Sequence, residues 1–177
     1  KLSHRLNRFL PDDIAVNKIY PVIDKAHARF SAISRTYEYL IHSAKDPFLT
    51  NQAWLLQIPL DIDLLNRAAS ILLEYNDFES FSRVKTDVNH FRCRLLSSVW
   101  TRERTLLKYT VCADRFLRGM VRTLVGTMVD IAKEKMTLEE FRKIIEKKDR
   151  RLAGAACPAH GLYLVKVDYP VDIFVKL

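Results

Sequence analysis

The order of its predicted elements places this 177-residue chain in the α+β class, as a largely antiparallel sheet with helices packed on it. Segments rich in aromatic and β-branched residues predict strands, and these occur in pairs with no βαβ repeat. Single helical segments separate the pairs. Because no internal repeat or linker-like composition divides the chain, we expect one domain over residues 1–177.

Strands are expected where apolar, aromatic and β-branched residues gather between turn signals. The segments that meet this description are residues 14–22, 36–42, 54–58, 91–100, 106–113 and 162–169. The pattern predicts an antiparallel pair from 91–100 and 106–113, joined at residues 101–105. The first thirteen residues are typical of the tail of a helix that runs into Pro11.

Two helices have clear start signals. Asp61 or Asp63 can act as the N-cap of a helix that runs to about Tyr75. Thr137 begins another helix, and Glu140, three residues on, completes a capping box.

Between these two helices, the segment FLRGMVRTLVG begins at Phe116, is helical in period and continues as a helix to about Ala132. On that helix Arg115, Arg118 and Arg122 fall within roughly 60° of one another. A buried guanidinium keeps its charge and needs an anion, which can be a protein carboxylate or a nucleic-acid phosphate. The first two arginines lie near the helix start and can reach solvent, whereas apolar residues flank the third on both sides.

Two glycines of the same segment, Gly119 and Gly126, lie seven residues apart near one face of the predicted helix. Because glycine has no Cβ, a second backbone can approach closely there. We therefore expect another segment of the chain to cross this helix.

The composition indicates a basic globular protein, with a net charge of +8 and a pI near 9.5. Such a charge favours polyanionic partners, nucleic acid first, although a merely soluble basic surface is an equal alternative. Cys93, Cys112 and Cys157 have no CxxC spacing, and the histidines are scattered, so we expect a reducing cytoplasm and no metal site. We also expect no signal peptide and no membrane-spanning segment.

Basic and aromatic residues alternate in the segment HARFSAISRTYEY, residues 27–39. Guanidinium groups such as those of Arg29 and Arg35 suit phosphates, and rings stack on unpaired RNA bases. Tyr37 and Tyr39 would share one face of a strand. The pattern alone favours two core tyrosines on a sheet.

A second basic segment, RKIIEKKDRR, spans residues 142–151. A solvated basic helix end and a phosphate-contact patch are equally good interpretations of it. Earlier in the chain, the sequence Lys85-Thr86-Asp87-Val88 has no general base or glycine turn beside its aspartate, so we interpret it as an ordinary loop.

Five motifs occur in order over essentially the whole chain, namely LNRFLPDDIAV (6–16), HARFSAISRTYEY (27–39), NDFESF (76–81), FLRGMVRTLVG (116–126) and AGAACPAHGLYLVKVDYP (153–170). Taken together, they make the chain similar to the tRNA pseudouridine synthase A family. Each motif is modest alone, and the ordered set is very specific.

This resemblance implies a pseudouridine synthase fold and a homodimer that works without cofactor or metal. The implied reaction isomerises uridine to pseudouridine at positions 38–40 of the tRNA anticodon stem-loop, after the base has flipped out of its stack. Tyr37 matches the family's active-site tyrosine, which packs on the target base. Arg122 matches the arginine that forms an ion pair with the nucleophilic aspartate. Arg29, Arg35, Arg118 and the 142–151 segment would hold phosphates.

One departure from the family is large. Its nucleophile lies in an RTDxGVHA-like loop before LNRFLPDDIAV, and no such sequence occurs among these 177 residues. We therefore expect this chain to be the C-terminal domain of the enzyme, lacking the nucleophile and inactive alone. The alternatives are a non-catalytic RNA-binding module and, more weakly, a basic structural domain.

Overall fold

The computed structural model describes residues 2–83 and 89–175, which form two compact units. The sheet unit comprises residues 33–168, and the terminal unit comprises residues 1–32 and 169–177. The aspartate of the loop at Lys85–Val88 lies outside the described residues. In the described part of the chain, no helix has the length and apolar character needed to cross a membrane.

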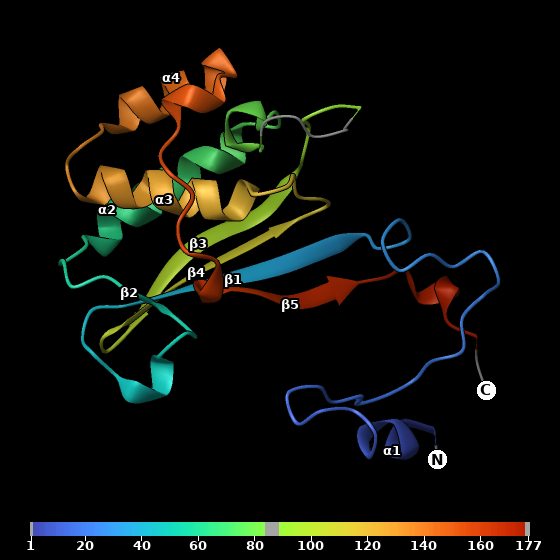
Figure 1. The fold of residues 1–177 in the computed structure, drawn as a ribbon. Coiled ribbons are helices and arrows are strands. Elements are labelled where there is room, and N and C mark those ends of the chain that lie inside the picture. Colours follow the sequence, from blue (N-terminus) through green and yellow to red (C-terminus); the bar gives the residue numbers. More distant parts are fainter. Residues whose placement is uncertain (1, 84–88, 176–177) are drawn as a thin grey trace. The chain divides into compact units, whose positions relative to one another are not determined.

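A five-stranded mixed sheet forms the centre of the sheet unit (Figure 1). Its strand β1 pairs antiparallel with β4 along one edge, and β4 pairs antiparallel with β3. The other edge of β1 is shared, because β5 pairs antiparallel with its first residues and β2 pairs parallel with its last two. The strands are β1 (Ser34–His42), β2 (Trp54–Leu55), β3 (Leu95–Glu103), β4 (Leu106–Ala113) and β5 (Leu162–Asp168).

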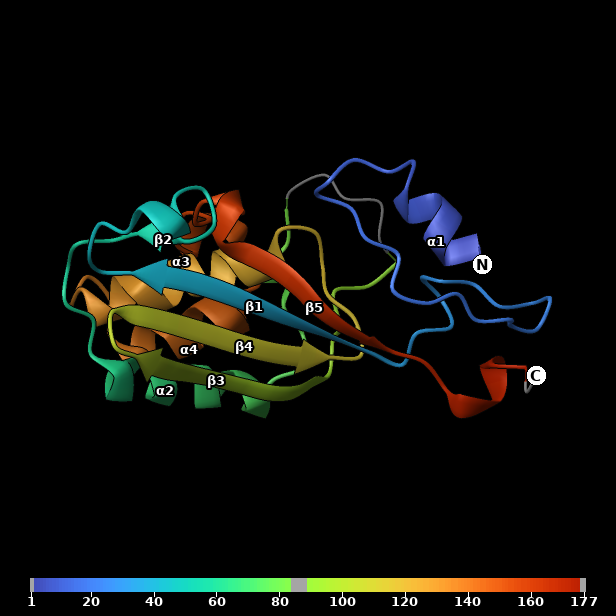
Figure 2. The same ribbon diagram turned by 90° about the horizontal axis from the view of Figure 1, so that it is seen from below.

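Three helices lie on one side of this sheet: two pack against its strands and the third packs on them, farther from the sheet, as Figures 1 and 2 show from two directions. They are α2 (Ile62–Ile71), α3 (Met120–Ala132) and α4 (Leu138–Lys147). The core lies between the two layers, because alternate residues of β4 point to the helices and are buried there. Its largest fully buried side chains are Trp100, Tyr39, Tyr109, Phe78, Phe81 and Phe141.

The predicted α+β class and the largely antiparallel sheet are confirmed, with adjusted strand bounds. The expected pair 91–100 and 106–113 is shifted, since β3 starts at Leu95 and extends to Glu103. The connection is therefore two residues long, and Arg104 adopts a positive φ of 54° in it. Residues 91–94 form no strand, although Arg92 makes an isolated bridge to Asp77.

Helix starts were well predicted where a cap marks them. Asp61 caps α2 through its side chain, which accepts from the backbone N–H groups of Asp63 and Leu64. The capping box at Thr137 and Glu140 is present in both directions.

The predicted start of the arginine-containing helix was wrong. The structure begins α3 at Met120, because Gly119 before it has φ = +79°, a left-handed conformation that ends helical geometry. Arg115 and Arg118 consequently lie on the loop that precedes the helix, and only Arg122 is on α3 itself.

In the terminal unit, the only helix of four or more residues among those described is α1 (Leu2–Asn7); the expected helix is present, but it ends four residues before Pro11 and does not run into it. The strand expected at residues 14–22 was wrong. Its apolar side chains, including Ile14 and Ile19, are about half exposed, and only Val22 makes a bridge, to Phe174. A strand needs a partner along its length, and apolar composition alone does not supply one.

Candidate active site

Tyr37 lies on β1 with its side chain on the helix-covered face, as its spacing from the buried Tyr39 predicts. It is half-buried and packs against the core. Its ring meets that of Phe116 edge to face, with 5.0 Å between the centroids. Phe116 comes from the loop before α3, so this contact joins the start of that loop to the sheet.

Arg122 lies in the first turn of α3 and is half-buried. Its Nε donates a hydrogen bond of 2.6 Å to the carbonyl oxygen of Cys157. Within residues 2–83 and 89–175 no carboxylate forms an ion pair with this guanidinium. Because Nε is on one edge of the planar group, the two Nη atoms on the other side are left to meet an anion.

Residues 153–158 form a strap that connects the helical layer to β5. Two successive carbonyls of this strap accept from opposite layers of the fold. That of Cys157 accepts from Arg122 on α3, and that of Pro158 accepts from the Tyr39 hydroxyl on β1 at 2.8 Å. The strap therefore ties Arg122 to the strand that carries Tyr37.

The buried thiol of Cys157 in this strap and the buried phenol of Tyr39 that bonds to the strap both stay protonated at neutral pH. Burial raises the pKa of the Cys157 thiol to about 12, against the opposing effects of Tyr39 and Arg122. Burial likewise raises the pKa of the Tyr39 hydroxyl well above its ordinary value. Both groups are thus protonated at pH 7, and Arg122 is the charged group here.

The other predicted arginines are distributed over three places. Arg35 on β1 donates from Nη1 to the carbonyl of Asp114 at 2.6 Å. Arg118 is exposed on the loop before α3, next but one to Phe116. Arg29 belongs to the terminal unit, where its guanidinium lies over the Phe30 ring.

Carboxylates neutralise much of the basic 142–151 segment at the end of α4. Four of its cations form ion pairs: Arg142 with Glu74, Lys143 with Glu139, Lys148 with Asp77 and Arg151 with Asp149. Of the two interpretations left open for this segment, these contacts favour a solvated basic helix end.

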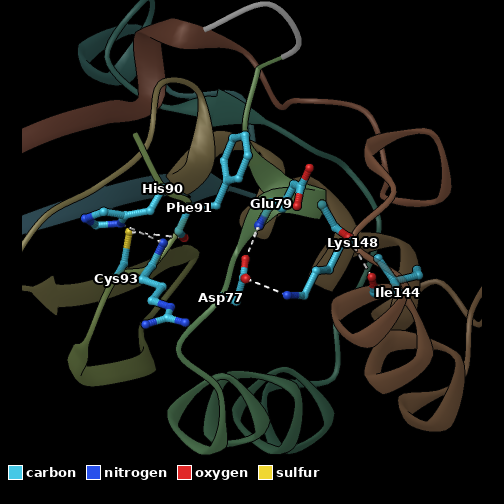
Figure 3. Close-up of polar contacts among 9 residues, drawn as sticks. Asp77, Glu79, His90, Phe91, Cys93, Ile144 and Lys148 are labelled. Atoms are coloured by element: carbon cyan, nitrogen blue, oxygen red, sulfur yellow. Dashed lines mark hydrogen bonds and ion pairs between the residues drawn. The ribbon is translucent and has the colours of Figure 1, made fainter. Parts of the chain in front are cut away.

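The NDFESF motif also has a structural explanation, which Figure 3 shows. Asp77 accepts from the Lys148 ammonium at 2.7 Å and from the Glu79 backbone N–H at 3.2 Å. Ser80 donates to the carbonyl of Ile144 at 2.6 Å. These bonds hold residues 76–81 against the C-terminal end of α4, so the motif has a structural role in this fold.

Two contributors to the site were missed by sequence reasoning. The aromatic contact of Phe116 and the acceptor role of the Cys157 backbone both depend on segments far apart in sequence. Gly126 gave a partial signal, since it did predict a close backbone approach, and the carbonyl of Ala155 indeed occupies the space of a Cβ there.

Comparisons with known proteins agree on one family. The model of the tRNA pseudouridine synthase family matches residues 68–170. Over 173 residues the chain is 46% identical to tRNA pseudouridine synthase A of Parabacteroides distasonis, covering 98% of this chain and 69% of that protein. It is 44% identical to the protein of the same name from Bacteroides fragilis, with the same coverage of each, and 38% identical to that of Dictyoglomus thermophilum, covering 96% and 69%.

Proposed function

This chain belongs to the tRNA pseudouridine synthase family, and from that premise we propose that Tyr37 and Arg122 form its share of an active site for uridine in the anticodon stem-loop of tRNA. The observation that carries the proposal is how the Arg122 guanidinium is bonded. Its guanidinium is held by a backbone carbonyl on one edge, and no described carboxylate pairs with it. An arginine held in this way suits a carboxylate brought to it from elsewhere.

The missing partner is the nucleophilic aspartate, supplied by chain outside residues 1–177. Paired with Arg122, this carboxylate stays ionised and keeps one orientation, because the opposite charge lowers its pKa and a bidentate bond fixes its plane. Residues 1–177 then act as the C-terminal domain of the enzyme, and they have no isomerase activity alone.

The reaction is an isomerisation whose atoms balance within the nucleotide. The bond between C1′ of the ribose and N1 of uracil breaks, the base turns, and a bond forms between C1′ and C5. The C5 proton leaves and N1 gains one, so no redox step is needed. Tyr37 contacts the flipped base, with its ring oriented by Phe116.

Arg118, Arg35 and Arg29 hold phosphates of the tRNA. Arg118 is the best supported of the three, because it is exposed close to Phe116 and forms no ion pair with a carboxylate among the described residues. The net charge of +8 adds a longer-range attraction for the polyanion.

The complete enzyme acts as a homodimer in the cytoplasm.

The test compares residues 1–177 with the complete enzyme on unmodified tRNA, scoring pseudouridine at each anticodon-arm position. We expect the complete enzyme alone to form pseudouridine. Its Arg122→Ala variant should lose turnover while largely keeping its affinity for tRNA. Pseudouridine formed by residues 1–177 would show that the nucleophile lies within them. Tight tRNA binding by the complete protein without turnover would favour a non-catalytic RNA-binding module.

A further inference from the structure

The strap, residues 153–158, runs across α3 before the chain enters β5 (Figure 1). Three hydrogen bonds fasten it to the helix. The N–H of Gly154 donates to the Thr127 hydroxyl at 3.0 Å, and the N–H of Cys157 donates to the carbonyl of Arg122 at 3.1 Å. The third bond runs from Nε of Arg122 back to the carbonyl of Cys157 at 2.6 Å.

Glycines on both sides allow this close approach. A Cβ at Gly126 of α3 would stand 1.9 Å from the carbonyl oxygen of Ala155. A Cβ at Gly154 of the strap would stand 2.8 Å from Oδ2 of Asp130 and 3.0 Å from the Cα of Thr127. The two backbones therefore touch over about one turn of α3, and a side chain at either glycine would push the strap away.

Thr127 fixes the end of the strap that is farther from Arg122. Its side chain is fully buried, and its hydroxyl donates to the carbonyl of Thr123 at 2.8 Å while accepting from Gly154. The hydroxyl of Thr123, one turn earlier and also buried, donates to the carbonyl of Gly119 at 3.1 Å. Both threonines are thus buried on α3 and donate to the carbonyl four residues earlier, and of the two it is Thr127 whose hydroxyl binds the strap.

We infer that Thr127 is a positioning residue for the active-site arginine, acting through the strap whose Cys157 carbonyl sets the orientation of the Arg122 guanidinium. The inference rests on the proposed function of Arg122. Loss of the Thr127 hydroxyl leaves the Gly154 N–H without its acceptor and frees the strap to move. The carbonyl of Cys157 moves with it, and the Nη edge of Arg122 no longer faces the carboxylate in a bidentate geometry.

The test measures turnover and tRNA affinity of the complete enzyme carrying Thr127→Val, with Thr123→Val as its matched control. Both changes replace a hydroxyl by a methyl group of nearly the same volume in the same helix. We expect Thr127→Val to lower kcat roughly 10- to 100-fold, the size of effect that a misplaced catalytic group produces, with tRNA affinity unchanged. Thr127→Ser, which restores the acceptor, should recover most of the activity, and Thr123→Val should stay close to wild type.

An unchanged kcat in Thr127→Val, or an equal loss in Thr123→Val, would overturn the inference. If Thr127→Val does not fold, Thr127→Ala removes the hydroxyl without adding a methyl group to the core and takes its place. Circular dichroism of each variant shows which case applies.

A second measurement is independent of catalysis. Hydrogen exchange at the Nε–H of Arg122, followed by NMR of the arginine side chains, reports the bond to Cys157 directly. Exchange should be faster in Thr127→Val than in Thr123→Val, and equal rates would contradict the inference. A complete enzyme that forms no pseudouridine but shows this difference would refute the proposed function and retain the role of Thr127 in holding Arg122.

Discussion

The rings of Tyr37 and Phe116 meet at an interplanar angle of 84°, with 5.0 Å between their centroids. This edge-to-face geometry directs the edge of one ring at the face of the other and is worth about 1 kcal/mol beyond the burial of the rings. It restrains the phenol that we propose to contact the substrate base. The loop before α3 thus reaches the active site through an aromatic side chain.

Replacement of Phe116 by leucine should therefore affect catalysis more than stability. We expect kcat of the complete enzyme to fall several-fold, because Tyr37 loses its ring partner, while the free energy of unfolding falls by about 1 kcal/mol. Phe141→Leu is the matched control, since Phe141 meets Phe81 at 6.0 Å in the core. If Phe141→Leu lowers kcat as much as Phe116→Leu does, the effect belongs to stability and not to Tyr37.

Arginine variants can separate the two basic surfaces of the chain. Arg118→Gln should weaken tRNA binding by the complete enzyme and reduce the slope of log K against log salt by about 1, as expected for one lost phosphate contact. Arg142→Gln should change neither quantity, because Glu74 already neutralises Arg142. Binding isotherms at several salt concentrations give both values, and the reverse ranking would place the phosphates on the α4 end.

The capping box of α4 gives a prediction about stability alone. Thr137→Ala removes the acceptor of the Glu140 N–H, a bond of 3.1 Å, and also the hydroxyl that donates to the Glu140 carboxylate. The free energy of unfolding should fall by about 1 kcal/mol in a urea titration. Glu140→Gln keeps an acceptor for the Thr137 N–H and should cost clearly less. Equal losses in the two variants would contradict this account of the cap.

The buried thiols predict a loss of stability at alkaline pH. Burial raises the pKa of Cys157 from an ordinary value of 9.0 to about 12. Between these values the unfolded chain releases the proton and the folded chain keeps it, so the stability present below pH 9 falls as the pH rises. The loss approaches about 1.4 kcal/mol per pH unit for this thiol.

The measurement is the free energy of unfolding from pH 8 to pH 11 for the wild-type chain and for Cys157→Ala. The variant should lose less stability over this interval, and the difference between the two curves isolates the thiol from the lysines and tyrosines that titrate nearby. Parallel curves would show that Cys157 ionises equally in the folded and unfolded states. Cys93, whose pKa burial also raises to about 12, should behave in the same way.

Local signals explain which parts of this fold could be predicted from the sequence. The capping box at Thr137 and the shared strand face of Tyr37 and Tyr39 depend on residues within a few positions, and both are present as expected. The start of α3 was missed because its apolar period continues through Gly119, whose positive φ ends the helix. The composition of residues 14–22 fits a strand, but strand pairing depends on other segments of the chain.

The site was only partly predictable for the same reason. Arg122 was identified by its charge among apolar neighbours and through the family resemblance, and Gly126 indicated a close approach. The sequence around Arg122 or Gly126 does not predict that the carbonyl of Cys157 accepts from the Arg122 guanidinium, because that contact spans 35 residues. The contact of Tyr37 with Phe116 likewise joins β1 to a loop that comes after both β3 and β4 in the sequence.

The placement of β1 also determines when the site can assemble during folding. Its partner β5 is so distant that the bond from Ser34 to Asp168 spans 134 residues. The strap that holds Arg122 is separated from the start of β5 by three residues, so we expect the arginine to gain its acceptor only as β5 docks. A domain closed by such distant pairing folds slowly, on the order of milliseconds to seconds. A growing chain therefore completes its sheet and its active-site geometry together, after nearly all of the core has been synthesised.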